Sequence, residues 1–164
     1  MRVFIFIFLG SVLLFACRNE REPSVSDADS TADSRSEKIS SPPYSVEVDE
    51  ETQNLSLVRS NEDLEGAGVN DIIGSINKKY KDIELDLVKE GKDTISLKID
   101  DARKLTQSMG SAGAEAYLAE LTFSLTELKG IKAVKIDFEE GDHAMPGVYT
   151  RDDFKTLADP AKKK

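Results

Sequence analysis

Residues 114–128, AEAYLAELTFSLTEL, carry the strongest helical pattern in this chain. Leucines and one alanine recur in it at spacings of three and four, which places them on one face of a helix. This face consists of Ala114, Leu118, Leu121, Leu125 and Leu128, flanked by Tyr117. Glu115, Glu120 and Glu127 are expected to point away from it. The sequence therefore predicts a helix that covers an apolar sheet.

The predicted helix has a start signal and a stop signal. Ser111, in the small-residue stretch 110–113, is the candidate N-cap. Gly130 has the conformational freedom needed just after a last helical turn, and Lys129 lies at the negative end of the helix dipole. We therefore expect the helix to end at Gly130.

Three segments near this helix have the alternation of β-strands. Apolar and polar side chains alternate over 83–87 and 95–99, on either side of a glycine-containing loop at 89–93. This pattern predicts a hairpin with one apolar face. Residues 134–138 alternate in the same way and predict a last strand.

The segment before this unit predicts a further hairpin and a helix. Alternation over 44–48 and again at Leu55 and Leu57, with a loop between, favours a hairpin. A helical stripe of Val69, Ile72, Ile73, Ile76 and Tyr80 follows. Together these elements predict an α+β domain, with two helices packed on one face of a small mixed or antiparallel sheet.

The N-terminus has the parts of a secretory leader. Arg2 precedes the apolar run 3–9, and Leu14-Phe15-Ala16-Cys17 resembles the lipobox of bacterial lipoproteins. The run is shorter than the roughly 20 apolar residues of a membrane span. We expect 1–16 to be a signal peptide and Cys17 to carry palmitate or a related lipid on the extracytoplasmic face of a cell membrane. A secreted protein with a chance cysteine, or an uncleaved anchor helix, are the alternatives.

The chain after the leader is divided by composition. Residues 17–43 contain the lipidation site and then a stretch rich in serine, aspartate and glutamate, which has little apolar surface to bury. This segment is predicted to be a disordered tether. Order is expected over 44–154, and 155–164 is a polar C-terminal tail.

Charge and cysteine content exclude several classes of function. The net charge of −9 opposes binding to nucleic acid and to anionic lipid. Cys17 is the single cysteine, so this chain forms no internal disulfide and no thiolate metal cluster.

Three stretches, 83–99, 110–128 and 130–141, resemble the GerMN domain family of spore germination and sporulation proteins. The shared features are a small-residue helix entrance, a leucine-rich helix, a glycine turn and a short apolar strand. The resemblance implies a fold similar to ring-building modules of secretion-type assemblies. It also implies a membrane-anchored assembly role without catalysis. This chain has room for one copy of the domain, which weakens transfer of the sporulation role.

Few residues are candidates for chemistry. His143 is the only histidine and lies in the loop 141–147, with no serine motif or free thiol beside it. Glu139, Glu140 and Asp142 could hold a divalent cation, but they lack the spacing of a calcium loop. We interpret them as a solvated acidic turn. The sequence thus predicts no catalytic residue, no metal and no cofactor.

Other polar signals have structural interpretations. Asp100 and Asp101 are expected to cap a turn at 102–105, and 49–51 is expected to be an exposed loop. The spacing Gly66-x-Gly68 lacks the third glycine of a nucleotide loop.

The function predicted from the sequence is a lipid-anchored protein that binds other extracytoplasmic proteins, through an edge strand or the polar faces of its helices. Self-association is compatible with this role. The alternative is a lipoprotein that binds a small ligand or a cell-wall fragment, and a hydrolase is third.

Overall fold

A computed structural model of the chain describes residues 38–52 and 54–158. The predicted signal peptide, Cys17 and most of the predicted tether lie outside these residues. The elements are β1 (Tyr44–Val48), β2 (Leu55–Arg59), α1 (Val69–Lys79), β3 (Asp86–Glu90), β4 (Thr94–Lys98), the π-helix η1 (Lys104–Ser108), α2 (Gly110–Leu125), β5 (Ala133–Asp137), β6 (Gly147–Tyr149), the 3₁₀-helix η2 (Arg151–Phe154) and α3 (Lys155–Ala158). Of the helices described, none is long and apolar enough to cross a membrane.

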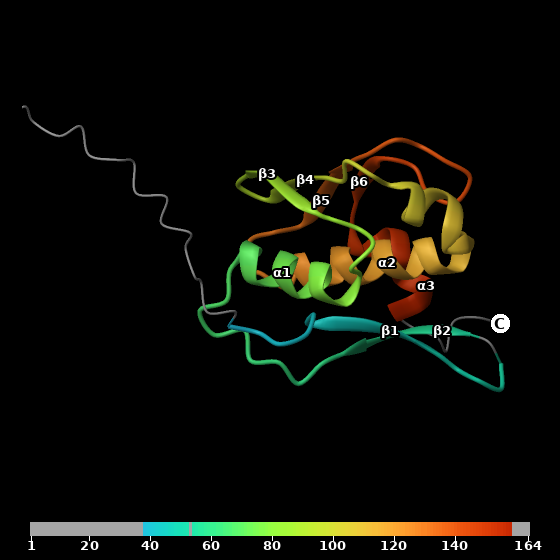
Figure 1. The fold of residues 1–164 in the computed structure, drawn as a ribbon. Coiled ribbons are helices and arrows are strands. Elements are labelled where there is room, and N and C mark those ends of the chain that lie inside the picture. Colours follow the sequence, from blue (N-terminus) through green and yellow to red (C-terminus); the bar gives the residue numbers. More distant parts are fainter. Residues whose placement is uncertain (1–37, 53, 159–164) are drawn as a thin grey trace, which may run out of the picture. The chain divides into compact units, whose positions relative to one another are not determined.

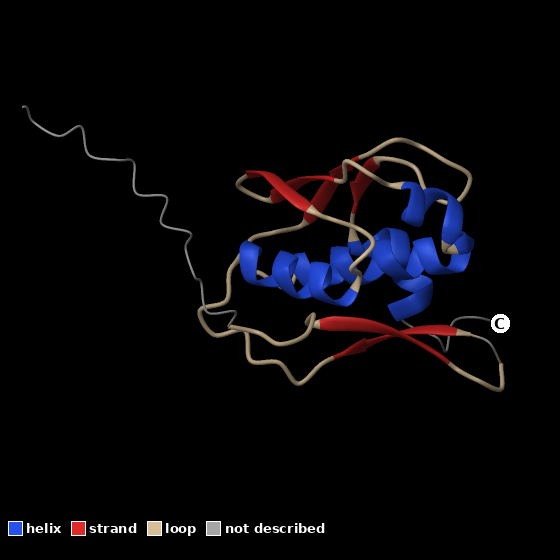
Figure 2. Cartoon of the chain, in the orientation of Figure 1, coloured by secondary structure: helices blue, strands red, loops and turns tan. Residues whose placement is uncertain are grey.

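The domain has three layers, with α1 and α2 in the middle (Figures 1 and 2). A four-stranded sheet of order β3-β4-β5-β6 lies on one side of the helices. The β1–β2 hairpin forms a separate two-stranded sheet on the other side. The α+β class is therefore confirmed, but the first hairpin does not join the main sheet. Because of this extra layer, α2 is covered on two sides.

The centre of the main sheet follows the predicted alternation. β4 and β5 are parallel, and Ile95 pairs with Val134 in register. Both side chains are fully buried. The hairpin of β3 and β4 is confirmed, although β3 begins at Asp86 rather than at residue 83. The side chain of Asn77 on α1 replaces a strand partner there, since it bonds both the N–H and the carbonyl of Leu85 at 2.9 and 3.0 Å.

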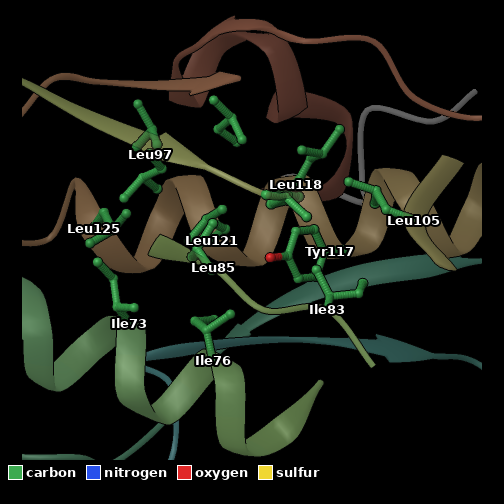
Figure 3. Close-up of a cluster of buried hydrophobic side chains, with 14 of the residues drawn as sticks. Ile73, Ile76, Ile83, Leu85, Leu97, Leu105, Tyr117, Leu118, Leu121 and Leu125 are labelled. Carbon is green, nitrogen blue, oxygen red and sulfur yellow. The ribbon is translucent and has the colours of Figure 1, made fainter. Parts of the chain in front are cut away.

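The apolar core lies between α1, α2 and the main sheet. Leu121 and Leu125 of α2 are fully buried, and Figure 3 shows them beside Leu97 of β4. Ile76 of α1 closes the same cluster from the other side. Each such leucine contributes about 1.5–3 kcal/mol by leaving water. The leucine face predicted for this helix is thus the face that holds the sheet.

The opposite side of α2 is polar and faces the hairpin. Glu120 on this side is fully buried, which corrects the expectation of a glutamate that merely points away from the core. Its Oε2 accepts bonds from Lys79 Nζ at 2.7 Å, Tyr80 OH at 3.1 Å and the N–H of Val46 at 3.4 Å. The carboxylate therefore ties β1 and the end of α1 to α2.

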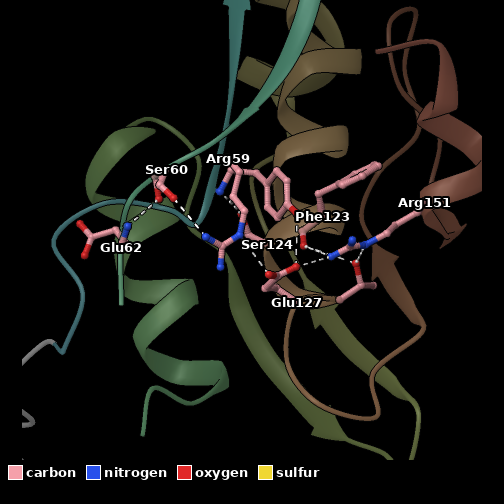
Figure 4. A network of polar contacts seen from close by, with 9 residues as sticks. Arg59, Ser60, Glu62, Phe123, Ser124, Glu127 and Arg151 are labelled. Carbon is pink, nitrogen blue, oxygen red and sulfur yellow. Dashed lines mark hydrogen bonds and ion pairs between the residues drawn. The ribbon is translucent and has the colours of Figure 1, made fainter. Parts of the chain in front are cut away.

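Ser124 lies one turn further along α2, and Glu127 lies in the turn just after the helix; both continue this polar stripe (Figure 4). Ser124 Oγ accepts the N–H of Tyr44 at 3.2 Å. Glu127 accepts bonds from Arg151 Nη2 at 2.8 Å, Arg59 Nε at 3.1 Å and Tyr44 OH at 3.3 Å. These donors, Arg151 foremost and then Arg59, hold the pKa of the Glu127 carboxyl below its ordinary value. Both strands of the hairpin are thereby fixed to α2 and to the turn that follows it.

The predicted stop at Gly130 is wrong, because α2 ends at Leu125. Arg151 donates to the carbonyl of Phe123 at 3.1 Å and to Thr126 Oγ1 at 2.8 Å, which takes the place of a further helical turn. Gly130 still has a positive φ of 93°, and it shapes the turn that leads into β5.

Buried residues lie on both sides of the predicted domain limits of 44–154. Ile39 is 2% exposed and Leu157, in α3, is 1% exposed. The described domain therefore includes residues from the predicted tether and from the predicted polar tail.

Candidate functional site

The loop after β5 folds over the start of α2 and forms an open pocket of about 360 Å³. The floor of the pocket is apolar and includes Leu118 and Phe154, both buried. The rim is polar and consists of Ser111, Glu115, Glu140, Asp142 and His143. Polar groups above an apolar floor are the usual lining of a small-ligand site.

The loop is held against the π-helix η1 by close backbone packing. His143 donates its N–H to the carbonyl of Thr106 at 3.0 Å. A Cβ at Gly141 would lie 2.7 Å from the Cβ of Thr106, so this position needs a residue without a side chain. η1 and the loop therefore fix the backbone of His143 beside the start of α2.

Ser111 and His143 form a hydrogen-bonded pair in the pocket, with Oγ and Nδ1 3.1 Å apart. This pairing corrects the prediction that Ser111 is the N-cap of α2. The N-cap is Met109, which forms no side-chain capping bond. The two paired residues are 32 positions apart in the chain, so no local motif could reveal them.

The carboxylates predicted beside His143 are only partly brought together with it. Glu140 and Asp142 line the pocket, and Glu115 joins them from α2, but Glu139 does not line it. In the described ranges, no group of three or more His, Cys, Asp or Glu residues is arranged to hold a metal ion.

The pair of Ser111 and His143 offers limited chemistry. A serine nucleophile needs a base that is itself oriented by a third group. Among the described residues, His143 has one side-chain partner, Ser111, and no carboxylate bonds its ring. The geometry is therefore suited to hydrogen bonding with a ligand, under a negative potential from the rim carboxylates.

Of the two aspartates predicted to cap the turn at 102–105, Asp101 binds its backbone, whereas Asp100 pairs with Lys98 at 2.9 Å. The Asp101 carboxylate accepts the N–H of Arg103 at 3.2 Å and binds the guanidinium as well. These bonds from Arg103 lower the pKa of Asp101 to about 2. Asp101 therefore starts the segment that becomes η1, although the π-helical turn itself was not predicted.

Asp49 and Gly68 likewise shape the backbone. Asp49 Oδ1 accepts the N–H groups of Glu51 and Thr52 at 3.0 and 2.7 Å, and this closes the turn between β1 and β2. Gly68 precedes α1, where its N–H bonds Asp71 at 2.8 Å. Both residues therefore have structural roles, and the Gly66-x-Gly68 spacing marks a helix start.

A second polar cluster, unforeseen from the sequence, surrounds Glu120. Its members are Lys79, Tyr80 and Tyr117, and the two tyrosine rings meet edge to face with centroids 4.9 Å apart. Burial raises the pKa of both phenols, and the nearby Glu120 adds to this effect. Tyr117 OH and Glu120 Oε1 have no hydrogen-bond partner among the described residues. A glutamate on the side opposite the leucines was the only signal in the sequence.

Comparison with known proteins assigns no function to this site. No protein-family model, curated protein or solved structure matches the chain. The GerMN resemblance therefore stays a prediction. Cys17, the predicted lipidation site, lies outside the described residues.

Proposed function

We propose that this protein is a lipoprotein of the cell envelope whose domain binds other extracytoplasmic proteins without catalysing a reaction. Cys17 is the proposed lipid attachment site, and the chain from 18 to the start of the described domain is the proposed tether. Tethering raises the local concentration of the domain near the membrane, so weak contacts suffice for binding. A role in sporulation or germination, suggested by the GerMN resemblance, is part of this proposal.

The observation that carries the proposal is the way the segment that enters the domain is bound to it, beginning with the buried Ile39 and with Ser41, whose Oγ donates to Glu62 at 2.9 Å. Tyr44, the first residue of β1, donates its N–H to Ser124, and its ring packs against Phe123 with centroids 5.4 Å apart. Pro42 and Pro43, just before it, are buried. A pull on the tether is thus resisted first by Ile39 and Ser41, and then by the contacts of Tyr44 with α2. This arrangement supports a role in which the tether presents the folded domain to its partners as a single rigid unit.

Fatty-acid labelling tests the anchor. Cells that express the full chain should incorporate labelled palmitate, and Cys17→Ala should abolish the incorporation. Ser24→Ala, a change within the tether, is the matched control and should leave labelling unchanged. Equal labelling of the wild type and Cys17→Ala would contradict the anchor.

Cross-linking tests the binding role. A photo-reactive residue at Val58, which is 38% exposed on the hairpin, should capture a defined envelope protein from intact cells. The same residue at Lys129, on the turn after α2, is the control. Turnover of a substrate by the purified chain would contradict the non-catalytic part of the proposal.

A second candidate function is the binding of a small ligand, and the pocket at His143 favours it. Carboxylates on the rim and an apolar floor suit an organic cation with an apolar body. Titration with a cationic amine such as spermidine should shift the NMR signals of Gly141 and His143. Glu140→Gln with Asp142→Asn should remove the shifts. Unchanged signals in the wild type would exclude this class of ligand.

A further inference from the structure

The two sheets of the domain have four edge strands, β1, β2, β3 and β6. An edge strand presents unpaired N–H and carbonyl groups that can pair with another chain. Proteins suppress such pairing with bulges, prolines, charged side chains, short strands or covering segments. Three of these four edges have such a feature.

The main sheet is protected at both of its edges. The register of β3 shifts between Leu87 and Lys89, so Val88 bulges out of the ladder and is 61% exposed. Charged residues occupy both ends of β3. β6 has three residues and follows Pro146 directly. Neither edge is suited to pairing with an added strand.

The outer edge of β1 is covered by side chains of α2. Its N–H groups at Tyr44 and Val46 point away from β2 and are bound by Ser124 and Glu120. These two contacts occupy two of the three outward positions of β1, since the third belongs to Val48 at the end of the strand.

The outer edge of β2 is open. Hydrogen bonds join Ser60 N to the carbonyl of Pro43 at 2.8 Å and Asp49 N to that of Asn54 at 2.9 Å. Bonded and non-bonded pairs alternate along an antiparallel ladder, so every second residue of β2 directs its backbone outward. In the described part of the chain, nothing hydrogen-bonds these outward groups. They belong to Leu55, Leu57 and Arg59.

β2 has no bulge and no proline, and its only charged residue is the last one, Arg59. α3 packs against this strand, but no described backbone hydrogen bond joins the two. Leu55 and Leu57 pack partly against the core and hold the strand in place.

We propose that the β2 edge binds an extended, basic segment of another envelope protein, which adds to the hairpin as a third strand. This inference deepens the proposed function by naming the surface and the partner chemistry. Backbone bonds to Leu55, Leu57 and Arg59 would hold the segment, as in other complexes formed by strand addition.

Charge selects a basic partner over a second copy of this chain. Glu47, Asp49 and Glu51 lie on the hairpin near the start of β2, and all three are exposed. Arg59, the one basic residue of the strand, is bound to Glu127. Two copies would bring together chains of net charge −9, whereas a basic segment complements the acidic turn.

Residue-resolved amide exchange on the full chain in detergent tests the proposal. The probe is a peptide of alternating valine and threonine with two lysines at each end, and the matched control peptide has aspartates in place of lysines. The lysine peptide should slow exchange at Leu55, Leu57 and Arg59 by about tenfold or more. Ser56 and Val58, already bonded to β1, should change far less. The aspartate peptide should have no effect.

Two variants sharpen the test. Leu57→Pro removes an outward N–H and leaves the ladder to β1 intact, so it should abolish peptide binding while Ser56 stays protected. Glu51→Lys changes an exposed side chain and should leave the fold intact. It should weaken binding of the lysine peptide by about tenfold, which corresponds to a loss of about 1.4 kcal/mol in binding free energy.

Three results would overturn the proposal. One is unchanged exchange at all three β2 residues with the lysine peptide. Another is protection of these residues that rises with protein concentration in the absence of peptide, which would show that a second copy binds the edge. The third is protection of these residues, again without peptide, that disappears when 159–164 are deleted, which would show that the chain's own tail binds the edge. Each leaves the labelling of Cys17 unaffected, so the anchor is judged separately.

Discussion

The two sides of α2 hold the domain together by different means. Towards the main sheet the helix presents leucines such as Leu121 and Leu125, both fully buried. Towards the hairpin it presents Glu120 and Ser124, and the turn that follows the helix presents Glu127; each of the three accepts a hydrogen bond from β1 or β2. Apolar burial is strong and non-directional, whereas hydrogen bonds are directional and weaker in net free energy. We therefore expect the sheet side to contribute most of the stability. On the hairpin side, hydrogen bonds fix the position of strands whose side chains Tyr44, Val46, Leu55 and Leu57 also pack partly against the core.

The largest effect is expected on the sheet side. Leu121→Ala leaves a cavity beneath the main sheet and should lower the free energy of unfolding by about 2–5 kcal/mol. Urea denaturation followed by far-UV circular dichroism measures this loss. Leu121→Met, which conserves volume, is the control and should cost less than about 1.5 kcal/mol. A loss below 1 kcal/mol in Leu121→Ala, on the same order as a single hydrogen bond, would argue that the sheet side is not dominant.

A smaller effect is expected from Glu120 on the hairpin side. Glu120→Ala removes the acceptor for Val46, Tyr80 and Lys79, and should cost about 1–3 kcal/mol because buried donors lose their partner. Glu120→Gln keeps an acceptor and should cost less. Amide exchange in β1 should become faster in Glu120→Ala, with the centre of the main sheet less affected. Equal acceleration in both places would contradict separate docking of the hairpin.

Ser124→Ala should have a smaller effect again. It deletes one bond, to the N–H of Tyr44, and should reduce stability by about 0.5–1.5 kcal/mol. Ser124→Thr retains the hydroxyl and serves as the control. The measurement is the urea midpoint of both variants against the wild type, and identical midpoints for all three proteins would show that this bond contributes nothing.

The smallest effect is expected from acid. The pKa of Glu127 is lowered in the folded state, so its pairing with Arg151 and Arg59 stabilises fully above the ordinary glutamate pKa of about 4.3. This stabilisation is lost as the pH falls through the lowered pKa. The side chain is 23% exposed, so the loss should stay below about 1 kcal/mol. Glu127→Gln should flatten this part of the curve of stability against pH between pH 5 and 3. If Glu127→Gln lost stability between pH 5 and 3 as steeply as the wild type, Glu127 would not be the group responsible for this pH dependence.

The strands β3 to β5 and the helices α1 and α2 could be predicted, because their patterns are local, whereas β6 and α3 were not predicted. Alternation over 95–99 and 134–138 identified β4 and β5, and the leucine spacing identified α2 and the face that covers them. Glycine and serine signals were less reliable. Gly130 was expected to end α2, but the helix stops at Leu125 because Arg151 binds the last turn.

The hairpin layer and the pocket could not be predicted, since both depend on contacts between distant residues. Glu120 was expected to point away from the core because of its place on the helix. Nothing in the sequence indicated that β1 would cover and bury it. Ser111 and His143 meet only after the loop beyond β5 folds back on η1. Local sequence patterns were enough to predict the α+β class. They could not predict the third layer, because the hairpin docks through contacts with residues distant in the sequence.

Native-state amide exchange at increasing urea tests most directly whether the hairpin is docked on the core and opens separately from it. We expect Ser45 and Ser56, which lie in β1 and β2, to exchange at a free energy of opening well below that of Ile95 and Val134 in the main sheet. Their opening should also depend less on urea, because it exposes less surface. A single opening free energy shared by all four amides would show that the hairpin and the core open together, and would contradict separate docking.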